Sequence, residues 1–181
     1  GFKGLRVRAL GGMGDAMRTL GAVPTSVPAT EVYTALERGT VDAVSFPATY
    51  AHASYRTYEI GDWYTANLAP GTVGCPTLMA LDAYEKLPPQ YKKLLDEAKP
   101  LGYKALMTAY KEADDTNVPL FKKAGLKFIT YSDKELARFR KIAAEPVWEE
   151  WVKTNKAKGA PAQELLDLIL DTAKAAKPAN G

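Results

Sequence analysis

Cysteine and histidine are almost absent from the sequence, whose 181 residues include one of each, Cys75 and His52. One cysteine excludes a disulfide within the chain and a cysteine-rich metal cluster, and one histidine leaves few ligands for a zinc site. We therefore expect neither a metal nor a cofactor. We interpret Cys75 as a small buried thiol, since free cysteines usually pack as small hydrophobic groups.

The sequence also lacks a strong excess of charge and a long apolar segment. Its 24 Lys and Arg residues against 21 Asp and Glu give a net charge of +3, so no basic field indicates nucleic acid as a partner. No apolar run approaches the roughly 18 to 20 residues that cross a bilayer, and we expect a chain that is not membrane-embedded. A strand starts almost at once and no signal peptide precedes it, so we expect sequence to be missing upstream.

The opening segment "LRVRALGGMGDAMRTLGA" (residues 5–22) predicts a strand, a glycine cluster and a helix. Alternation over residues 5–10 places Arg6 and Arg8 on one face, and Asp15 and Gly21 are candidates for the N-cap and the end of the helix. A dinucleotide-binding loop needs a third glycine where Met17 stands, and it follows an apolar strand. The segment therefore argues against a nucleotide site.

Alternating strand and helix patterns continue through the first third of the chain and predict an α/β fold with a parallel sheet. Aromatic residues then gather around His52 and Arg56. Prolines divide a helical region over residues 82–125, and Pro146 should kink or interrupt a later helix. The remaining predicted elements are a helix over 31–39, a strand over 40–47, a strand pair or one long irregular strand over 61–81, a strand over 126–131, a capping box between Ser132 and Glu135, a last helix after Pro161 and a frayed tail over 177–181.

No arrangement of residues predicts catalysis. The neighbouring acids Asp114 and Asp115 diverge on a helix, so we interpret them as solvated. Ser45 lacks the glycines of a nucleophile elbow, and nothing in the spacing of Cys75 and His52 supports contact between them. We expect the protein not to be an enzyme. An α/β enzyme acting on a carboxylate stays open as the alternative.

Three segments together resemble a known family: "GLRVR", "LGAVPTSVPATEVYTALERGTVDA" and "AYEKLPPQYKKLLDEA". They are similar to the C-terminal part of the solute receptors of tripartite ATP-independent periplasmic (TRAP) transporters, the C4-dicarboxylate-binding or DctP-like family, over about residues 3 to 155. The resemblance implies a type II periplasmic-binding fold of two α/β lobes with hinge crossings, the N-terminal lobe being largely missing. It assigns residues 1–70 to the second lobe, 71–115 to a hinge crossing and return to the first lobe, and 116–181 to a second-lobe strand and helices spanning the lobes.

The resemblance also implies a ligand site, in which Arg8 matches the arginine that clamps the carboxylate of the solute. A planar guanidinium suits this role because it meets a carboxylate with two parallel hydrogen bonds; Arg6 is expected to be solvated. The glycines that follow, Gly12 among them, would give the ligand clearance. Ser45 and Phe46 stand where relatives carry other polar or acidic residues, and a small Ala29 beside Phe46 and Tyr50 would suit an apolar or aromatic portion of the ligand.

The function implied is that of a periplasmic receptor, which captures an organic acid and delivers it to the subunits of a TRAP membrane permease. The ligand would undergo no chemistry. A truncated fragment that binds nothing by itself remains an alternative, since one wall of the cleft would be missing.

Overall fold

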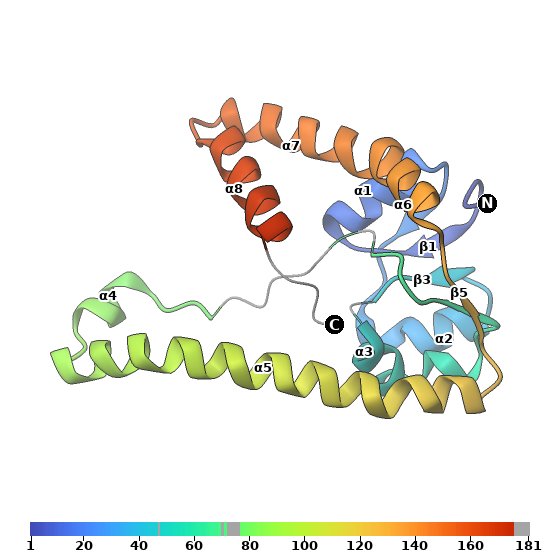
Figure 1. Cartoon of the computed structure of the whole chain (residues 1–181), viewed down its shortest axis with the longest axis horizontal. Helices are drawn as coiled ribbons and strands as arrows, with labels where there is room; N and C mark the ends of the chain where they lie inside the picture. Colours follow the sequence, from blue (N-terminus) through green and yellow to red (C-terminus); the bar gives the residue numbers. More distant parts are fainter. Residues whose placement is uncertain (47, 70, 72–76, 176–181) are drawn as a thin grey trace. The chain divides into compact units, whose positions relative to one another are not determined.

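The computed structural model describes residues 1–46, 48–69, 71 and 77–175, and Figure 1 traces their helices and strands. The chain divides into two compact units. The first comprises Gly1–Ser26, Leu68–Gly71 and Tyr131–Gly181, and the second comprises Val27–Asn67 and Thr72–Thr130. Predictions that fall on Pro47, Cys75 and the tail over 177–181 lie outside the described residues.

The first unit begins with a strand, a helix and a second strand. Strand β1 (Arg6–Arg8) pairs in parallel with β2 (Val23–Thr25), so that Arg8 lies opposite Thr25. Helix α1 (Gly11–Thr19) connects them and buries Met13, Ala16 and Met17, and Val7 and Ala9 are buried as well. The predicted order of strand, helix and parallel strand is thus confirmed.

The predicted start of helix α1 is wrong, and its predicted end is right. The helix begins at Gly11, with Leu10 as N-cap, and Asp15 lies inside it in an ion pair of 2.6 Å with Arg18. The glycines are therefore part of the helix and not a loop before it. At the other end Gly21 has a φ of +81°, which favours glycine, and its N–H donates to the carbonyl of Arg18.

The C-terminal part of the first unit is helical, and two local predictions hold there. Ser132 and Glu135 form the predicted capping box, in which the Ser132 N–H donates to the Glu135 carboxylate over 2.8 Å. The turn just before Pro146 is π-helical. Proline has no N–H for the regular helical hydrogen bond, and its ring crowds the preceding turn, so the helix is irregular there. The elements are α6 (Asp133–Phe139), the π-helical turn η3 (Arg140–Ala144), α7 (Glu145–Lys156) and α8 (Ala162–Ala175), which packs on α7.

The described part of the second unit contains one parallel strand pair and several helices. Strand β4 (Trp63–Thr65) pairs with β5 (Lys127–Ile129). Within the described part of residues 61–81, β4 is the one strand, so the alternative of one long strand is wrong, whereas the alternative of a strand pair stays a prediction. The other elements are η1 (Ala29–Glu31), α2 (Val32–Glu37), β3 (Ala43–Val44), α3 (Ala48–Ser54), η2 (Thr57–Glu59), α4 (Leu81–Glu85) and α5 (Pro89–Lys123).

Helix α5 runs for 35 residues through Pro100 and Pro119. The expectation that prolines divide this region is therefore wrong at Pro100 and Pro119, but it is confirmed at Pro89, which begins α5 after the end of α4 at Glu85. An interior proline costs about 3 kcal/mol. Packing of the C-terminal half against α3 offsets this cost at Pro119 (Figure 1), whereas Pro100 lies in the exposed N-terminal half. Phe121 lies in that half and is completely buried.

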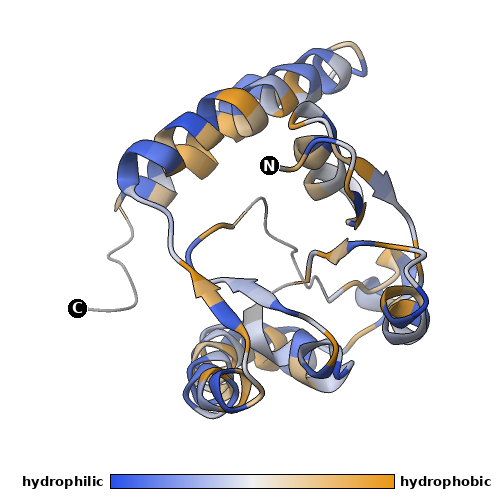
Figure 2. Ribbon diagram, turned by 90° about the vertical axis from the view of Figure 1, so that its right-hand side faces the viewer, coloured by the Kyte–Doolittle hydropathy of each residue, from blue (hydrophilic) through white to orange (hydrophobic). Residues whose placement is uncertain are grey.

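The helices carry hydrophilic and hydrophobic residues along the same segments, as the colours of Figure 2 show. Such mixed helices can bury one face and expose the other, as α1 does with Met13, Ala16 and Met17. Among the described residues, no helix combines the length and apolar character that a membrane crossing needs.

Candidate ligand-binding site

Arg8 is the one predicted ligand residue with a charge, and the structure buries it. Only 4% of Arg8 is exposed, between the buried residues Val7 and Ala9, whereas Arg6 is exposed as predicted. Burying a guanidinium is costly unless it is paired, and Arg8 does interact with other groups of the chain. A ligand carboxylate at Arg8 would add to these contacts or replace them.

The N-terminus of helix α1 follows Arg8 after two residues. Its N-cap residue, Leu10, makes no side-chain capping bond, and the first turn contains no acidic residue. The first N–H groups of a helix carry partial positive charge and favour an anion. Arg8 and the start of α1 therefore have the same electrostatic preference.

Gly12 lies in the first turn of α1 and is exposed. A Cβ atom built at Gly12 would meet no heavy atom within 4 Å, whereas one at Gly14 would lie 3.0 Å from the carbonyl oxygen of Ala9. A side chain at Gly14 would thus press on the backbone at Ala9, a packing role that the sequence analysis did not assign. The ligand clearance expected at Gly12 stays a prediction.

The other four predicted ligand residues belong to the second unit. Ala29 starts the 3-10 helix η1, Ser45 and Phe46 follow strand β3, and Tyr50 lies in helix α3. Phe46 stacks on Tyr55 with ring centroids 5.2 Å apart, whereas Tyr50 meets the ring of Tyr110 edge to face at 5.3 Å. Phe46 and Tyr50 therefore have different aromatic partners. That all six residues line one site stays a prediction.

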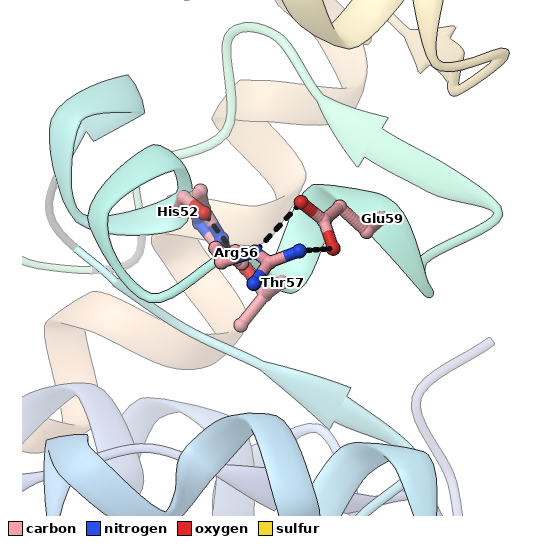
Figure 3. Close-up of polar contacts among 4 residues, drawn as sticks. All are labelled: His52, Arg56, Thr57 and Glu59. Carbon is pink, nitrogen blue, oxygen red and sulfur yellow. Dashed lines mark hydrogen bonds and ion pairs between the residues drawn. The ribbon is translucent and has the colours of Figure 1, made fainter.

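His52 lies in an aromatic cluster of the second unit. Its ring meets those of Phe46, Tyr64 and Phe121 edge to face, at 5.5, 5.6 and 6.4 Å. The Nδ1 atom lies 3.0 Å from the Thr57 hydroxyl (Figure 3). Burial lowers the pKa of His52 from 6.5 to about 4, so that the ring is neutral near pH 7. These contacts are those of a packed residue.

Arg56 connects the end of α3 to η2 through an ion pair. Its Nε and Nη2 atoms each donate to the Glu59 carboxylate over 2.8 Å (Figure 3). Arg56 has a φ of +56°, the one positive φ of a non-glycine residue in the described part of the chain. The hydrogen bond from Arg56 lowers the pKa of Glu59. The pair stabilises the turn between α3 and η2, which the sequence analysis did not predict.

Thr49 forms a polar network with two residues of helix α5. Its hydroxyl donates to the Asp114 carboxylate over 2.6 Å and accepts a bond of 3.4 Å from the Asn117 amide. Asp114 and Asp115 were both expected to be solvated. Both residues are exposed, so this expectation is confirmed, and Asp114 in addition accepts the hydrogen bond from Thr49. Asp115 pairs with Lys111 between two exposed side chains.

A concave and largely apolar surface in the first unit encloses a volume of about 300 Å³. It contains none of the six predicted ligand residues. No group of three or more metal-ligating side chains occurs in residues 1–46, 48–69, 71 and 77–175. The assignment of these six residues to a ligand site thus depends on the family resemblance and on the surroundings of each residue. The residues that line the concave surface include Phe2, Leu20, Leu68, Tyr131, Leu136 and Phe139.

Comparison with known proteins identifies the class of this chain. The DctP family, described as bacterial extracellular solute-binding protein, family 7, matches residues 1–155. The chain belongs to this family, and its α/β structure is that of the solved TRAP solute-binding proteins. The predicted family and fold class are therefore confirmed.

Two curated relatives are binding proteins. A solute-binding protein of Albidiferax ferrireducens is 26% identical over 163 residues, which are 85% of this chain and 46% of the relative. The monocarboxylate 2-oxoacid-binding periplasmic protein of a Nostoc species is 25% identical over 155 residues, 82% of this chain and 41% of the relative. The chain thus spans less than half the length of these two relatives.

A solved structure gives the same result for the fold. A TRAP solute-binding protein from a marine metagenome, specific for aromatic acid ligands and bound to metahydroxyphenylacetate, is 25% identical. It superimposes with a TM-score of 0.68 over 92% of this chain and 53% of its own.

Proposed function

We propose that this chain is part of a periplasmic receptor that binds an organic acid by its carboxylate and delivers the acid to a TRAP membrane permease. The observation that carries the proposal is the burial of Arg8 on strand β1 in a member of a solute-binding family. A buried guanidinium keeps its charge and presents two parallel donors, which is what recognition of a carboxylate needs.

The start of helix α1 supports the same role for this segment. Its first turn is free of acidic residues and of a side-chain cap, so its N–H groups would favour the same anion as Arg8. Gly12, which has space around it, would leave room beside the carboxylate.

We further propose that the ligand has an apolar or aromatic portion. Phe46 and Tyr50 would contact that portion, while Ala29 leaves room for it and Ser45 supplies a hydroxyl. The marine relative named as specific for aromatic acids supports this assignment, and the Nostoc relative named for 2-oxoacids supports a monocarboxylate.

The arrangement of lobes is part of the same proposal. Residues 1–70 would belong to the second lobe, residues 71–115 would form a hinge crossing and return to the first, and residues 116–181 would return and span both. Closure of the lobes around the anion would present the loaded receptor to the permease, because only the closed form contacts the ligand from both sides.

Calorimetric titration of the complete receptor that contains this chain tests the proposal. The ligands are 3-hydroxyphenylacetate and pyruvate, and the variants are Arg8→Met and, as the matched control, Arg6→Met on the same strand. We expect Arg8→Met to weaken binding by about 2 to 5 kcal/mol, the loss typical of truncating one partner of a buried charge pair. Arg6→Met should stay within about 0.5 kcal/mol of the wild type, because Arg6 is exposed.

Two results would contradict the proposal. An Arg8→Met affinity equal to that of Arg6→Met would remove Arg8 from the site. A product formed from either acid, detected by mass spectrometry, would favour the alternative of an α/β enzyme.

A further inference from the structure

One face of helix α5 contacts helix α3 residue by residue. Tyr110, Asp114, Asn117 and Phe121 follow one another at helical spacing, so their side chains lie on one face. Tyr110 contacts Tyr50, Asp114 and Asn117 bind Thr49, and Phe121 contacts the ring of His52. The apolar members of this face supply packing, and the two polar members bind a single hydroxyl.

Thr49 is the residue on which this polar network converges. It is 3% exposed, and its hydroxyl both donates and accepts a hydrogen bond. Packing between apolar groups tolerates sliding and rotation of a helix, whereas a short hydrogen bond fixes direction as well as distance. The bond of 2.6 Å to Asp114 thus connects the first turn of α3 to α5 in a defined direction.

The other end of α3 is held independently. His52 contacts the hydroxyl of Thr57, which is itself buried, and Arg56 pairs with Glu59 in the next turn. Helix α3 is short, from Ala48 to Ser54, so contacts at both ends leave little freedom between them. Tyr50 lies inside this helix, and Phe46 lies two residues before it.

We infer that Thr49, bound to Asp114 and Asn117, is a positioning residue that sets the placement of Phe46 and Tyr50 and thereby the ligand selectivity of the receptor. The inference rests on the proposed function, because it takes Phe46 and Tyr50 as the ligand wall. Thr49 acts through Tyr50, which follows it in helix α3, and through His52 of the same helix, whose ring contacts Phe46. Its hydroxyl is already engaged within the protein.

The test compares four variants of the complete receptor. Thr49→Val keeps the shape of the side chain and removes both hydrogen bonds, whereas Thr49→Ser keeps the hydroxyl. Asp114→Ala removes the acceptor, and Asp115→Ala is its control on the adjacent position, where the side chain pairs with Lys111 at the exposed surface. Affinities for 3-hydroxyphenylacetate and pyruvate are measured by calorimetry, and melting temperatures by circular dichroism.

We expect Thr49→Val and Asp114→Ala to change the ratio of the two affinities by about tenfold, and Thr49→Ser and Asp115→Ala to leave it within about twofold. A lower melting temperature with an unchanged ratio would overturn the inference, because a purely structural role predicts that result.

Hydrogen exchange of the backbone amides of residues 45–54 tests the positioning role in the absence of a ligand. Faster exchange there in Thr49→Val, but not in Thr49→Ser or Asp115→Ala, supports the inference, and equal exchange in all variants overturns it. A wild-type receptor that binds neither acid would contradict the proposed function, and the exchange result would then decide on the positioning role alone.

Discussion

Acidification should destabilise the second unit through His52, the single histidine of the chain. The ring is surrounded by aromatic side chains, and its Nδ1 atom is held by the Thr57 hydroxyl. Burial disfavours the charged ring and lowers its pKa to about 4. In the unfolded chain the same ring titrates near 6.5.

The sign of the effect follows from proton binding. Between pH 6.5 and about 4 the unfolded chain binds a proton at His52 that the folded chain does not. The stabilising contribution is therefore complete above pH 6.5 and is lost as the pH falls toward 4. The shift corresponds to about 3 kcal/mol at 1.36 kcal/mol per pKa unit. Since the ring is partly accessible to solvent, we expect a loss of about 2 to 3 kcal/mol.

Nuclear magnetic resonance can measure this pKa directly, because one histidine gives one ring Cε1–Hε1 signal. We expect its midpoint near 4. Urea unfolding of the wild type and of His52→Gln, from pH 7 to pH 4.5, measures the free energy. The stability advantage of the wild type should shrink as the pH falls. A midpoint between 6 and 7, or parallel pH profiles for the two proteins, would refute the reasoning.

Two further pairs of variants test the packing of each unit. Phe121→Ala should lower the free energy of unfolding by about 3 to 5 kcal/mol, because Phe121 is fully buried. Leu101→Ala on the same helix is the control and should cost under about 0.5 kcal/mol, because Leu101 is 69% exposed. Equal costs for the two variants in urea unfolding would contradict the described core. Gly14→Ala should cost about 1 to 2 kcal/mol because its Cβ would press on Ala9, and Gly12→Ala should be neutral or stabilising by up to about 1 kcal/mol. A Gly14→Ala protein that melts at or above the temperature of Gly12→Ala would remove the packing role of Gly14.

Features of the fold that depend on near neighbours were predictable from the sequence. The capping box of Ser132 and Glu135, the helix end at Gly21 and the irregular turn before Pro146 all follow from groups within about one helical turn. The family resemblance supplied the fold class, because three quoted motifs follow one another in the family's order between residues 4 and 98. The resemblance also supplied Arg8, although alternation alone did not distinguish it from Arg6.

Features that depend on distant residues were not predictable. Thr49 and Asp114 are 65 positions apart, and nothing in either segment indicates that they meet. Pro119 lies inside a helix because the neighbouring turns pack on α3, which a local rule for proline does not consider. In each case tertiary contact overrides the local preference.

The glycines after strand β1 show how the structure distinguishes two interpretations of one motif. In a dinucleotide site they would admit a pyrophosphate, but Met17, at the position of the third glycine, is buried. Gly14 is needed because a side chain there would press on the carbonyl of Ala9. The glycine that packing requires is thus different from Gly12, around which there is space. Changes at Gly14 should therefore act on stability, while changes at Arg8 should act on binding, and the two effects can be measured separately in one receptor.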